Sequence, residues 1–495
     1  MATERSSSAL AESVDVVVVG ARCAGSPLAA LLAQAGLRVV VIEQARFPRG
    51  VLSSNLMEAD ALDFLRRLGV EPQLRATGVR FLRTADIRLN DVQIKAPFPL
   101  RFDDLGGAAF LQRHLLDTIL ADRAAEVGAD VRQGVKLVEL LWSGHRVCGV
   151  RVRQNGRETD IRARLVVGAD GRASSVAYMA GARKYNVLPN QRSYYFTLFE
   201  GAAAETEDTF VFHRWGDRMV WGGAADSGLY LVGVSPEEHE RDYFRSNAER
   251  GLLAHVHSCA PMRDVLHGAK IATKISGILN FDGYFREPTG PGWVLTGDAG
   301  HFKDPSIGRG IGDAFAQAET LAGSITAGLD APVRPDGPRG LDDALVRWGQ
   351  WRDARFEGHY WLANNLGSRG VLPEMVSQTV QQRERTGELG PFFDLFAHRA
   401  DYDAVFPISR LGAATAEVAT SNPLATAWQA TQLLGREVGR RWRRKARVLG
   451  PPELRTAPPT ELLLDSPSFN AQIQPDDAPD LPGSGALIEG DIRAN

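Results

Sequence analysis

The sequence predicts an α/β protein with a Rossmann-like domain, an inserted antiparallel-sheet domain and a helical C-terminal region. Three observations lead to this prediction. An apolar segment ends at Gly20 and enters a Gly-rich loop and a helical pattern, short segments in the middle of the chain alternate apolar and polar residues, and the pattern is helical after about residue 330. The 495 residues are enough for more than one compact unit.

The N-terminal unit is a predicted strand, loop, helix and second strand. Val14 to Val19 is apolar except for Asp15, as expected for a buried parallel strand. The helix tolerates Pro27 in its first turn, where the missing N–H would have no partner, and it ends at Gly36. A second strand, LRVVVIE, ends at Glu43. These elements form one βαβ unit of conventional length.

Later segments are predicted from the same kinds of apolar pattern. LLDTILADRAAEVGADV is a predicted helix, RLVVGADGRAS and GWVLTGDAG are strands that enter Gly-rich turns, and DTFVFHRW, RMVWGGA and LYLVGVS alternate as in an antiparallel sheet. We place the segments as follows: a polar tail at 1–13, the Rossmann-like domain at 14–75, 101–185 and 285–330, the inserted domain at 76–100 and 186–284, C-terminal helices at 331–450, and a flexible or surface-draped tail at 451–495.

Composition excludes several classes of protein. Lys and Arg total 57 against 60 Asp and Glu, a net charge of −3, so nucleic acid is not an expected partner. The three cysteines are far apart and the HVH stretch lacks a nearby third ligand, so we predict neither a disulfide framework nor a metal site. The sequence contains no signal-peptide pattern and no apolar run of ~18 residues, which predicts a cytoplasmic protein without a membrane span.

The loop GARCAG, from Gly20 to Gly25, has the features of a phosphate site. Gly20 permits the tight turn, Gly25 lets the helix approach the strand, and backbone N–H groups with a helix N-terminus favour an anion. Arg22 replaces the usual middle glycine and must point outward, where it adds positive charge. Glu43 offers two acceptor oxygens to a ribose diol. The alternative is an ordinary strand-to-helix turn.

Two further motifs follow predicted strands. VVGADGRASSV places Asp170 at a strand end, although an Asp-Gly pair alone is usually a turn. In GWVLTGDAGHFKDPSIGRGIGDAFAQAE the strand ends at Gly297 and Asp298, and a turn containing Gly308 and Gly310 opens a helix whose N-terminus favours a negative group. Together, the three motifs indicate a nucleotide cofactor.

The motifs GARCAG with Glu43, GADG, and GDAGHFKDPSIGRGIGDA, in this order, resemble the FAD-dependent oxidoreductases related to para-hydroxybenzoate hydroxylase, in particular the bacterial branch with GAR and GDAG…KDP. The resemblance covers roughly residues 14 to 330. It implies a glutathione-reductase-type FAD-binding domain with an inserted substrate domain. One departure concerns the second motif, where the family often has Arg and this chain has Ala177, which leaves the handling of the nicotinamide cofactor open.

The resemblance implies that the first loop holds the FAD pyrophosphate, Glu43 the adenosine ribose, and Arg113 the phosphates or the ribityl chain. It further implies that Asp298 binds the ribityl chain and that Pro305 to Gly310 runs along the isoalloxazine ring. The full set of implied cofactor-binding residues is Gly20, Ala21, Arg22, Ala24, Gly25, Glu43, Arg46, Arg113, Asp170, Gly297, Asp298, Pro305, Gly308 and Gly310.

The activity implied is that of an NAD(P)H-dependent monooxygenase, in which NAD(P)H docks transiently and one oxygen atom of O2 reaches the substrate through a flavin C4a-hydroperoxide. The sequence contains only one dinucleotide fingerprint, so a separate NAD(P)H domain is not expected. Aromatic residues between about Gln191 and Phe281 indicate a largely apolar, aromatic or polyketide-like substrate. His213 and His301 are candidate catalytic groups, with packed histidines as the alternative.

Three other functions remain open. A reductase or dehydrogenase of carbon–carbon bonds, similar to geranylgeranyl reductases, uses much the same loops. A halogenase needs a lysine between flavin and substrate and a Trp-x-Trp-x-Ile-Pro segment, yet the chain has no such segment and no lysine between Met1 and Ile94. A non-enzymatic binding module has no need of Glu43, Arg113 and Asp298 together. The sequence gives no indication of oligomeric state.

Overall fold

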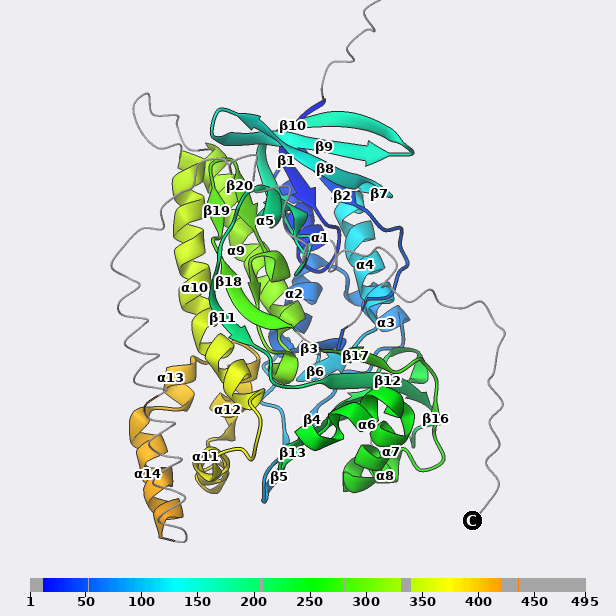
Figure 1. Ribbon diagram of the computed structural model, residues 1–495, viewed down its shortest axis with the longest axis vertical. Coiled ribbons are helices and arrows are strands. Elements are labelled where there is room, and N and C mark those ends of the chain that lie inside the picture. Colours follow the sequence, from blue (N-terminus) through cyan, green and yellow to red (C-terminus); the bar gives the residue numbers. More distant parts are fainter. Residues whose placement is uncertain are drawn as a thin grey trace, which may run out of the picture. The chain divides into compact units, whose positions relative to one another are not determined.

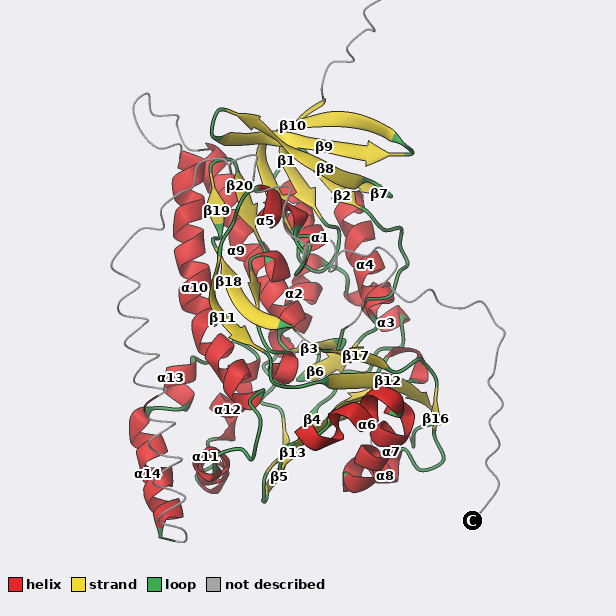
Figure 2. Ribbon diagram, in the orientation of Figure 1, coloured by secondary structure: helices red, strands yellow, loops and turns green. Residues whose placement is uncertain are grey.

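The computed structural model describes residues 12–51, 53–203, 208–279, 281–330, 340–420 and 435. The predicted tail at 451–495, nearly all of the one at 1–13, and all of the helical region predicted after residue 420 except residue 435 lie outside these residues. The described chain contains two eight-stranded sheets, a three-stranded sheet and a two-stranded sheet. Figure 2 shows the strands of the two large sheets as separate groups, with helices packed against both.

The first large sheet has the order β19-β20-β10-β1-β2-β7, and its central strands run parallel. The long strand β10 pairs with β9 along its first half and with β1 along most of its length, which joins the antiparallel hairpin β8-β9 to the parallel sheet. The bounds are β1 (Glu12–Val19), β2 (Val39–Glu43), β7 (Asp130–Gln133), β8 (Lys136–Ser143), β9 (Arg146–Gln154), β10 (Arg157–Gly168), β19 (Thr289–Gly290) and β20 (Trp293–Leu295).

Both faces of this sheet are covered, which explains the continuous apolar run of β1. Val16 and Val18 pack against helices α1, α4 and α9, whereas Val17 and Val19 pack toward β8, β9 and the short helix α5. The long helices α9 and α10 lie side by side (Figure 1), and Trp348 Nε1 donates to Thr320 Oγ1 at 3.1 Å between them. The bounds are α1 (Gly25–Gln34), α4 (Arg113–Glu126), α5 (Ser175–Met179), α9 (Gly310–Asp330) and α10 (Gly340–Leu366).

Smaller elements connect the first sheet to the second. β3 leads into α2 and α3 and pairs antiparallel with the more distant β6, and a three-stranded sheet of order β11-β18-β21 lies against α10. The bounds are β3 (Leu56–Glu58), α2 (Ala59–Leu68), α3 (Glu71–Ala76), β6 (Ala108–Phe110), β11 (Lys184–Pro189), β18 (Asp282–Arg286), β21 (His301–Phe302), and the 3-10 turns η2 (Asp226–Gly228), η3 (Glu238–Glu240), η4 (Gly297–Ala299) and η5 (Pro305–Ile307).

The second large sheet has the order β16-β12-β15-β14-β13-β4-β5, with β17 also paired to β12. All its pairs are antiparallel except β13 with β4, so the predicted antiparallel sheet is confirmed with one parallel pair. Helices α6, α7 and α8 cover one face. The bounds are β4 (Thr84–Leu89), β5 (Val92–Pro97), β12 (Tyr194–Glu200), β13 (Thr209–Trp215), β14 (Arg218–Ala224), β15 (Tyr230–Ser235), β16 (Lys270–Ile271), β17 (Ser276–Ile278), α6 (Arg241–Ser246), α7 (Ala248–Ser258) and α8 (Ala260–Val265).

The other face of the second sheet packs against the C-terminal helices, which the sequence pattern predicts correctly as helical between residues 340 and 420. These helices are α11 (Glu374–Arg385), α12 (Leu389–Phe396), α13 (Tyr402–Val405) and α14 (Ile408–Ala419), together with the end of α10. Among the helices described, none is both long and apolar enough to cross a membrane.

Candidate cofactor and substrate site

The three Gly-rich motifs meet at one edge of the first sheet. They follow the adjacent parallel strands β1, β10 and β20, whose carboxyl ends lie together. Gly20 has a φ of +103°, and a Cβ there would lie 2.5 Å from the carbonyl oxygen of Ala169 in the second motif. A Cβ on Gly297, in the third motif, would lie 2.7 Å from the Cβ of Ala24. Open α/β sheets bind their ligands at this edge.

The N-terminus of α1 points into this edge. The helix begins at Gly25, where a Cβ would overlap the carbonyl oxygen of Gly20, so only glycine permits this approach of helix and strand. Ala24 provides no side-chain cap, and the first turn, which is fully described, contains no acidic residue. The positive end of the helix dipole is therefore not countered by its own side chains and favours an anion.

Two arginines beside the loop share one buried carboxylate. Arg22 Nη1 donates to Asp117 Oδ2 at 3.1 Å, and Arg113 donates to both Asp117 oxygens at 2.9 to 3.1 Å. The Asp117 side chain is fully buried. Cys23 Sγ adds a contact to Asp117 Oδ1 at 3.4 Å, and burial raises the pKa of its thiol. Arg22 also lies 3.9 Å from Glu43, so these contacts hold both guanidinium groups beside the loop, where they can donate to a pyrophosphate.

Glu43 ends β2 next to the same loop. Its carboxylate accepts the backbone N–H of Ala21 at 3.1 Å and that of Ala45 at 2.9 Å. These bonds hold the first loop to the end of β2, and each carboxylate oxygen retains capacity for a further donor. Arg46 follows as an exposed side chain that lies beside Gly134.

The two predicted aspartates of the later motifs differ in their surroundings. Asp170 accepts from Ser174 Oγ at 2.5 Å and from the Ser175 N–H at 2.7 Å, so it holds the start of α5. Asp298 lies in η4, where the hydroxyl of Tyr284 donates to its backbone carbonyl at 2.7 Å. Burial raises the pKa of both carboxyl groups.

The turn of the third motif forms one wall of a cavity. Pro305 begins η5, Gly308 follows with a φ of +71°, and Gly310 is the first residue of α9. Asp304 fixes the turn by accepting the Ser306 N–H at 2.9 Å.

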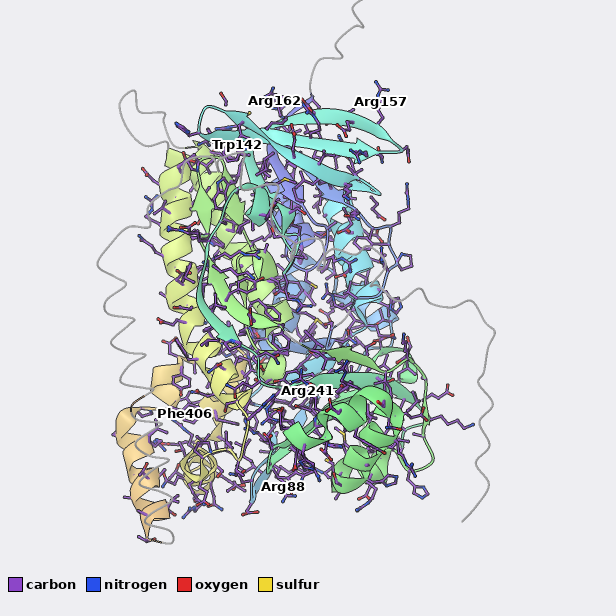
Figure 3. The ribbon with its side chains drawn as sticks, viewed as in Figure 1. Arg88, Trp142, Arg157, Arg162, Arg241 and Phe406 are labelled. Atoms are coloured by element: carbon purple, nitrogen blue, oxygen red, sulfur yellow. The ribbon has the colours of Figure 1, made fainter. Side chains whose placement is uncertain are left out.

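The cavity has a volume of about 120 Å³ and lies between this turn, the second sheet and the C-terminal helices. Its wall is mostly apolar and aromatic. Phe406, which lies between α13 and α14 and is labelled in Figure 3, contributes to it. Other aromatic lining residues are Phe98, Phe210, Phe212, Trp221 and Phe393, and the polar ones include Glu58, Tyr194 and Ser306. Such a cavity suits a largely apolar ligand held by few polar contacts.

The structure places the two predicted histidines elsewhere. His213 is buried on the face of β13 that carries Val211, opposite Phe210 and Phe212, and its Nε2 lies 2.8 Å from Asp86 Oδ1. His301 stacks on Phe285 with ring centroids 4.2 Å apart, and burial lowers its pKa well below the usual range. The wall that the described residues form around the cavity includes neither histidine.

A buried charged cluster beside the cavity is absent from the predicted site. Arg309 is fully buried, donates to Asp60 through Nη1 and Nη2 at 2.6 Å each, and donates from Nη1 to Glu58 Oε2 at 3.1 Å. Lys303 pairs with Asp313 in the same cluster. In the sequence, the sign of this cluster is Arg309, which lies between two glycines of the third motif. Its partners Glu58 and Asp60 could not be recognised from the sequence, because they lie about 250 residues earlier in the chain. No group of three His, Cys, Asp or Glu arranged to hold a metal occurs among the residues described.

Comparison with known proteins identifies the class. Residues 13–249 match the family model of the FAD binding domain, so this part of the chain belongs to that family, and the protein is an FAD-dependent oxidoreductase. The digeranylgeranylglycerophospholipid reductase of Methanocella arvoryzae is 26% identical over 337 residues, which cover 63% of this chain and 77% of that protein.

Two solved structures share the fold. The flavin-dependent brominase Bmp2 superposes with a TM-score of 0.66 at 17% identity, covering 83% of this chain and all of the brominase. PqsL of Pseudomonas aeruginosa, a probable FAD-dependent monooxygenase, superposes with a TM-score of 0.57 at 19% identity, covering 76% of this chain and 99% of PqsL. The similarities confirm the mixed α/β FAD-binding fold with a separate antiparallel sheet and C-terminal helices.

Proposed function

We propose that the protein is an NAD(P)H-dependent FAD monooxygenase acting on a largely apolar, aromatic or polyketide-like small molecule. The observation that carries this proposal is the aromatic-lined cavity directly against the Pro305–Gly308 turn. Bound FAD supplies electron transfer and oxygen activation. The balanced reaction converts substrate–H, O2, NAD(P)H and a proton into substrate–OH, water and NAD(P)+.

The residues at the sheet edge fit FAD, and we assign them accordingly. The first loop and the α1 N-terminus bind the pyrophosphate, with Arg22 and Arg113 supplying the counter-charge. Glu43 binds the adenosine ribose, and Arg46 lies at the adenosine end. The remaining members of the set are Asp298 for the ribityl chain, Pro305, Gly308 and Gly310 for the ring, and Ala21, Ala24, Asp170 and Gly297 as backbone supports of the three loops.

The cavity contributes by position and by exclusion of water. Its apolar wall desolvates a ligand at the turn assigned to the ring, and its aromatic side chains present faces and edges to a flat molecule. Water kept from the site cannot divert activated oxygen. The cavity residues thus exclude water from the substrate and hold the substrate close to the cofactor.

The decisive experiment is NAD(P)H oxidation by the purified FAD-containing protein with a panel of phenolic and polyketide compounds, in air and under nitrogen. We expect one class of compound to stimulate oxidation and to yield an oxygenated product that carries label from labelled O2. Loss of that product under nitrogen supports the monooxygenase. Substrate turnover that continues under nitrogen with an artificial electron acceptor contradicts it.

Turnover under nitrogen would point to an alternative function, which two observations favour. The similarity to a digeranylgeranylglycerophospholipid reductase and the apolar wall of the cavity favour reduction or oxidation of carbon–carbon bonds as the alternative function. In that case the product contains no oxygen from O2 and the hydrogen count of the substrate changes by two.

Substitutions of Phe212 and of its neighbour His213 test which face of β13 contacts the substrate. We expect Phe212→Ala to raise KM about tenfold, because it removes an aromatic wall of the cavity. His213→Gln is expected to leave KM unchanged and to lower the free energy of unfolding by about 1–3 kcal/mol, because it disturbs a buried contact with Asp86. Steady-state kinetics and urea denaturation measure both; a larger KM effect from His213→Gln contradicts the assignment.

A further inference from the structure

Glu58 contributes a carboxyl group to the edge of the mostly apolar cavity. It is the last residue of β3, immediately before α2, and its side chain is 8% exposed. Oε2 accepts from Arg309 Nη1, whereas Oε1 faces the third-motif turn: a Cβ on Gly308 would lie 3.3 Å from it. Glu58 is therefore next to both the substrate wall and the turn assigned to the flavin ring.

The charges of the cluster do not balance. Three carboxylates, those of Glu58, Asp60 and Asp313, share two cations, Arg309 and Lys303. Asp60 accepts two hydrogen bonds of 2.6 Å from Arg309, and Asp313 pairs with Lys303. Glu58 accepts one hydrogen bond of 3.1 Å from Arg309 and is therefore the carboxylate of the three with the weakest cationic partner. An unbalanced negative charge in a buried site favours binding of one proton.

Glu58 is the group that takes this proton. Burial raises its pKa to about 8, Arg309 opposes the rise, and Asp60 adds to it. Glu58 thus changes its protonation state near neutral pH. Other ionisable groups face Glu58 or the same end of the cavity. Lys303 and Asp313 lie in the cluster, and His398, whose own pKa burial lowers, lies 3.3 Å from Asp313. Asp394 and Arg399 lie on the C-terminal wall, where Arg399 pairs with Asp104.

We propose that Glu58 is the acid–base residue of the substrate cavity and that the substrate is a phenol or enol whose hydroxyl hydrogen-bonds to it. The proposal rests on the function proposed above and names its substrate class. A carboxylic acid would add another anion to a cluster that already has one too many. A neutral hydroxyl on a flat ring matches both the carboxyl group of Glu58 and the aromatic wall.

The proton transfer is simple. The hydroxyl O–H bond breaks, its electron pair stays on the substrate oxygen, and the proton bonds to a carboxylate oxygen of Glu58. The charge on the oxygen delocalises into the ring and increases its reactivity toward an electrophile. Glu58 returns the proton after reaction. A base whose pKa lies near the working pH is the efficient choice for this step.

The first test needs no turnover. Infrared difference spectra of the FAD-containing protein, recorded across a pH series without NAD(P)H, follow the carbonyl stretch of a protonated carboxyl group. We expect a band that disappears with a midpoint near pH 8 and that is absent from Glu58→Gln. Asp60→Asn is the matched control, because Asp60 also binds Arg309 but does not line the cavity. Its band should remain and its midpoint should fall, since one opposing negative charge is gone.

The second test uses para-nitrophenol as the probe, whose absorbance distinguishes phenol from phenolate. Binding to Glu58→Gln is expected to be roughly tenfold weaker and to lose the part of the wild-type pH dependence that has its midpoint near pH 8, leaving only the ionisation of the probe itself. Glu58→Asp, which keeps a carboxyl group, should retain that dependence, and it replaces Glu58→Gln if the latter fails to fold.

With a phenolic substrate, kcat/KM of Glu58→Gln should fall by about 100-fold. A titrating band that persists in Glu58→Gln, or probe binding with unchanged pH dependence, overturns the role of Glu58. Because the infrared and probe measurements use oxidised protein, their failure is distinct from a failure of oxygen insertion.

Discussion

Gly25→Ala is expected to yield a protein that does not retain FAD and whose free energy of unfolding is lower by about 3 kcal/mol. A Cβ at this position overlaps the carbonyl oxygen of Gly20 and lies 3.1 Å from Val18 Cγ1. Both neighbours belong to β1 or the turn that follows it, in the centre of the buried sheet, so neither can move away at low cost. Helix α1 must then shift outward, and its N-terminus leaves the phosphate position.

Gly323→Ala is the matched control, because Gly323 lies on an exposed turn of α9 and a Cβ there has no neighbour within 4 Å. We expect normal FAD content and a free energy of unfolding that is higher by about 0.5–1 kcal/mol, the usual gain for Gly to Ala within a helix. Flavin absorbance and urea denaturation measure both quantities. Normal FAD content in Gly25→Ala would contradict the close contact of α1 with β1.

Asp117→Ala is expected to lower the free energy of unfolding of the FAD-free protein by about 3–5 kcal/mol, because it leaves Arg22 and Arg113 without their shared carboxylate. Added FAD should recover part of this loss, since a pyrophosphate provides the missing negative charge. FAD should therefore raise the Tm of Asp117→Ala by more than it raises the Tm of the wild type.

Asp160→Ala is the comparison for an exposed pair. Asp160 accepts from Arg151 at 2.7 Å on the surface of the β8-β10 region, and its loss is expected to cost no more than about 1 kcal/mol. Thermal denaturation with and without FAD measures all three proteins. An equal FAD-induced shift in wild type and Asp117→Ala would show that the two arginines do not face the phosphates.

The parts of the fold that local sequence determines were predicted well. The first strand, the helix that follows Gly25 and the second strand at Glu43 occur as predicted, because each depends on neighbouring residues: apolar side chains on both faces of β1 and glycines where the backbone requires them. The alternating segments became β13, β14 and β15 for the same reason. The parallel pairing of β13 with β4 was not predicted, since its partner lies more than 100 residues away.

The predicted site was incomplete in a different way. Strand alternation puts Phe210 and Phe212 on the face of β13 opposite His213. It could not show which face meets the cavity, because that depends on where α10 to α13 pack. Asp170 illustrates the same limit: its motif is visible in the sequence, but its hydrogen bonds to the start of α5 depend on the folded backbone of the turn.

The sequence by itself determined the class of protein. Three Gly-rich turns at strand ends, together with Glu43, Arg113 and Asp298, carry the resemblance to FAD-dependent oxidoreductases, and such turns are visible in sequence because phosphate binding needs backbone conformations that short, specific segments provide. Only the tertiary structure decided the electrostatics of the cavity. Glu58 and Arg309 are 251 residues apart in the sequence, and their burial raises the free energy of an unbalanced negative charge, which favours binding of a proton.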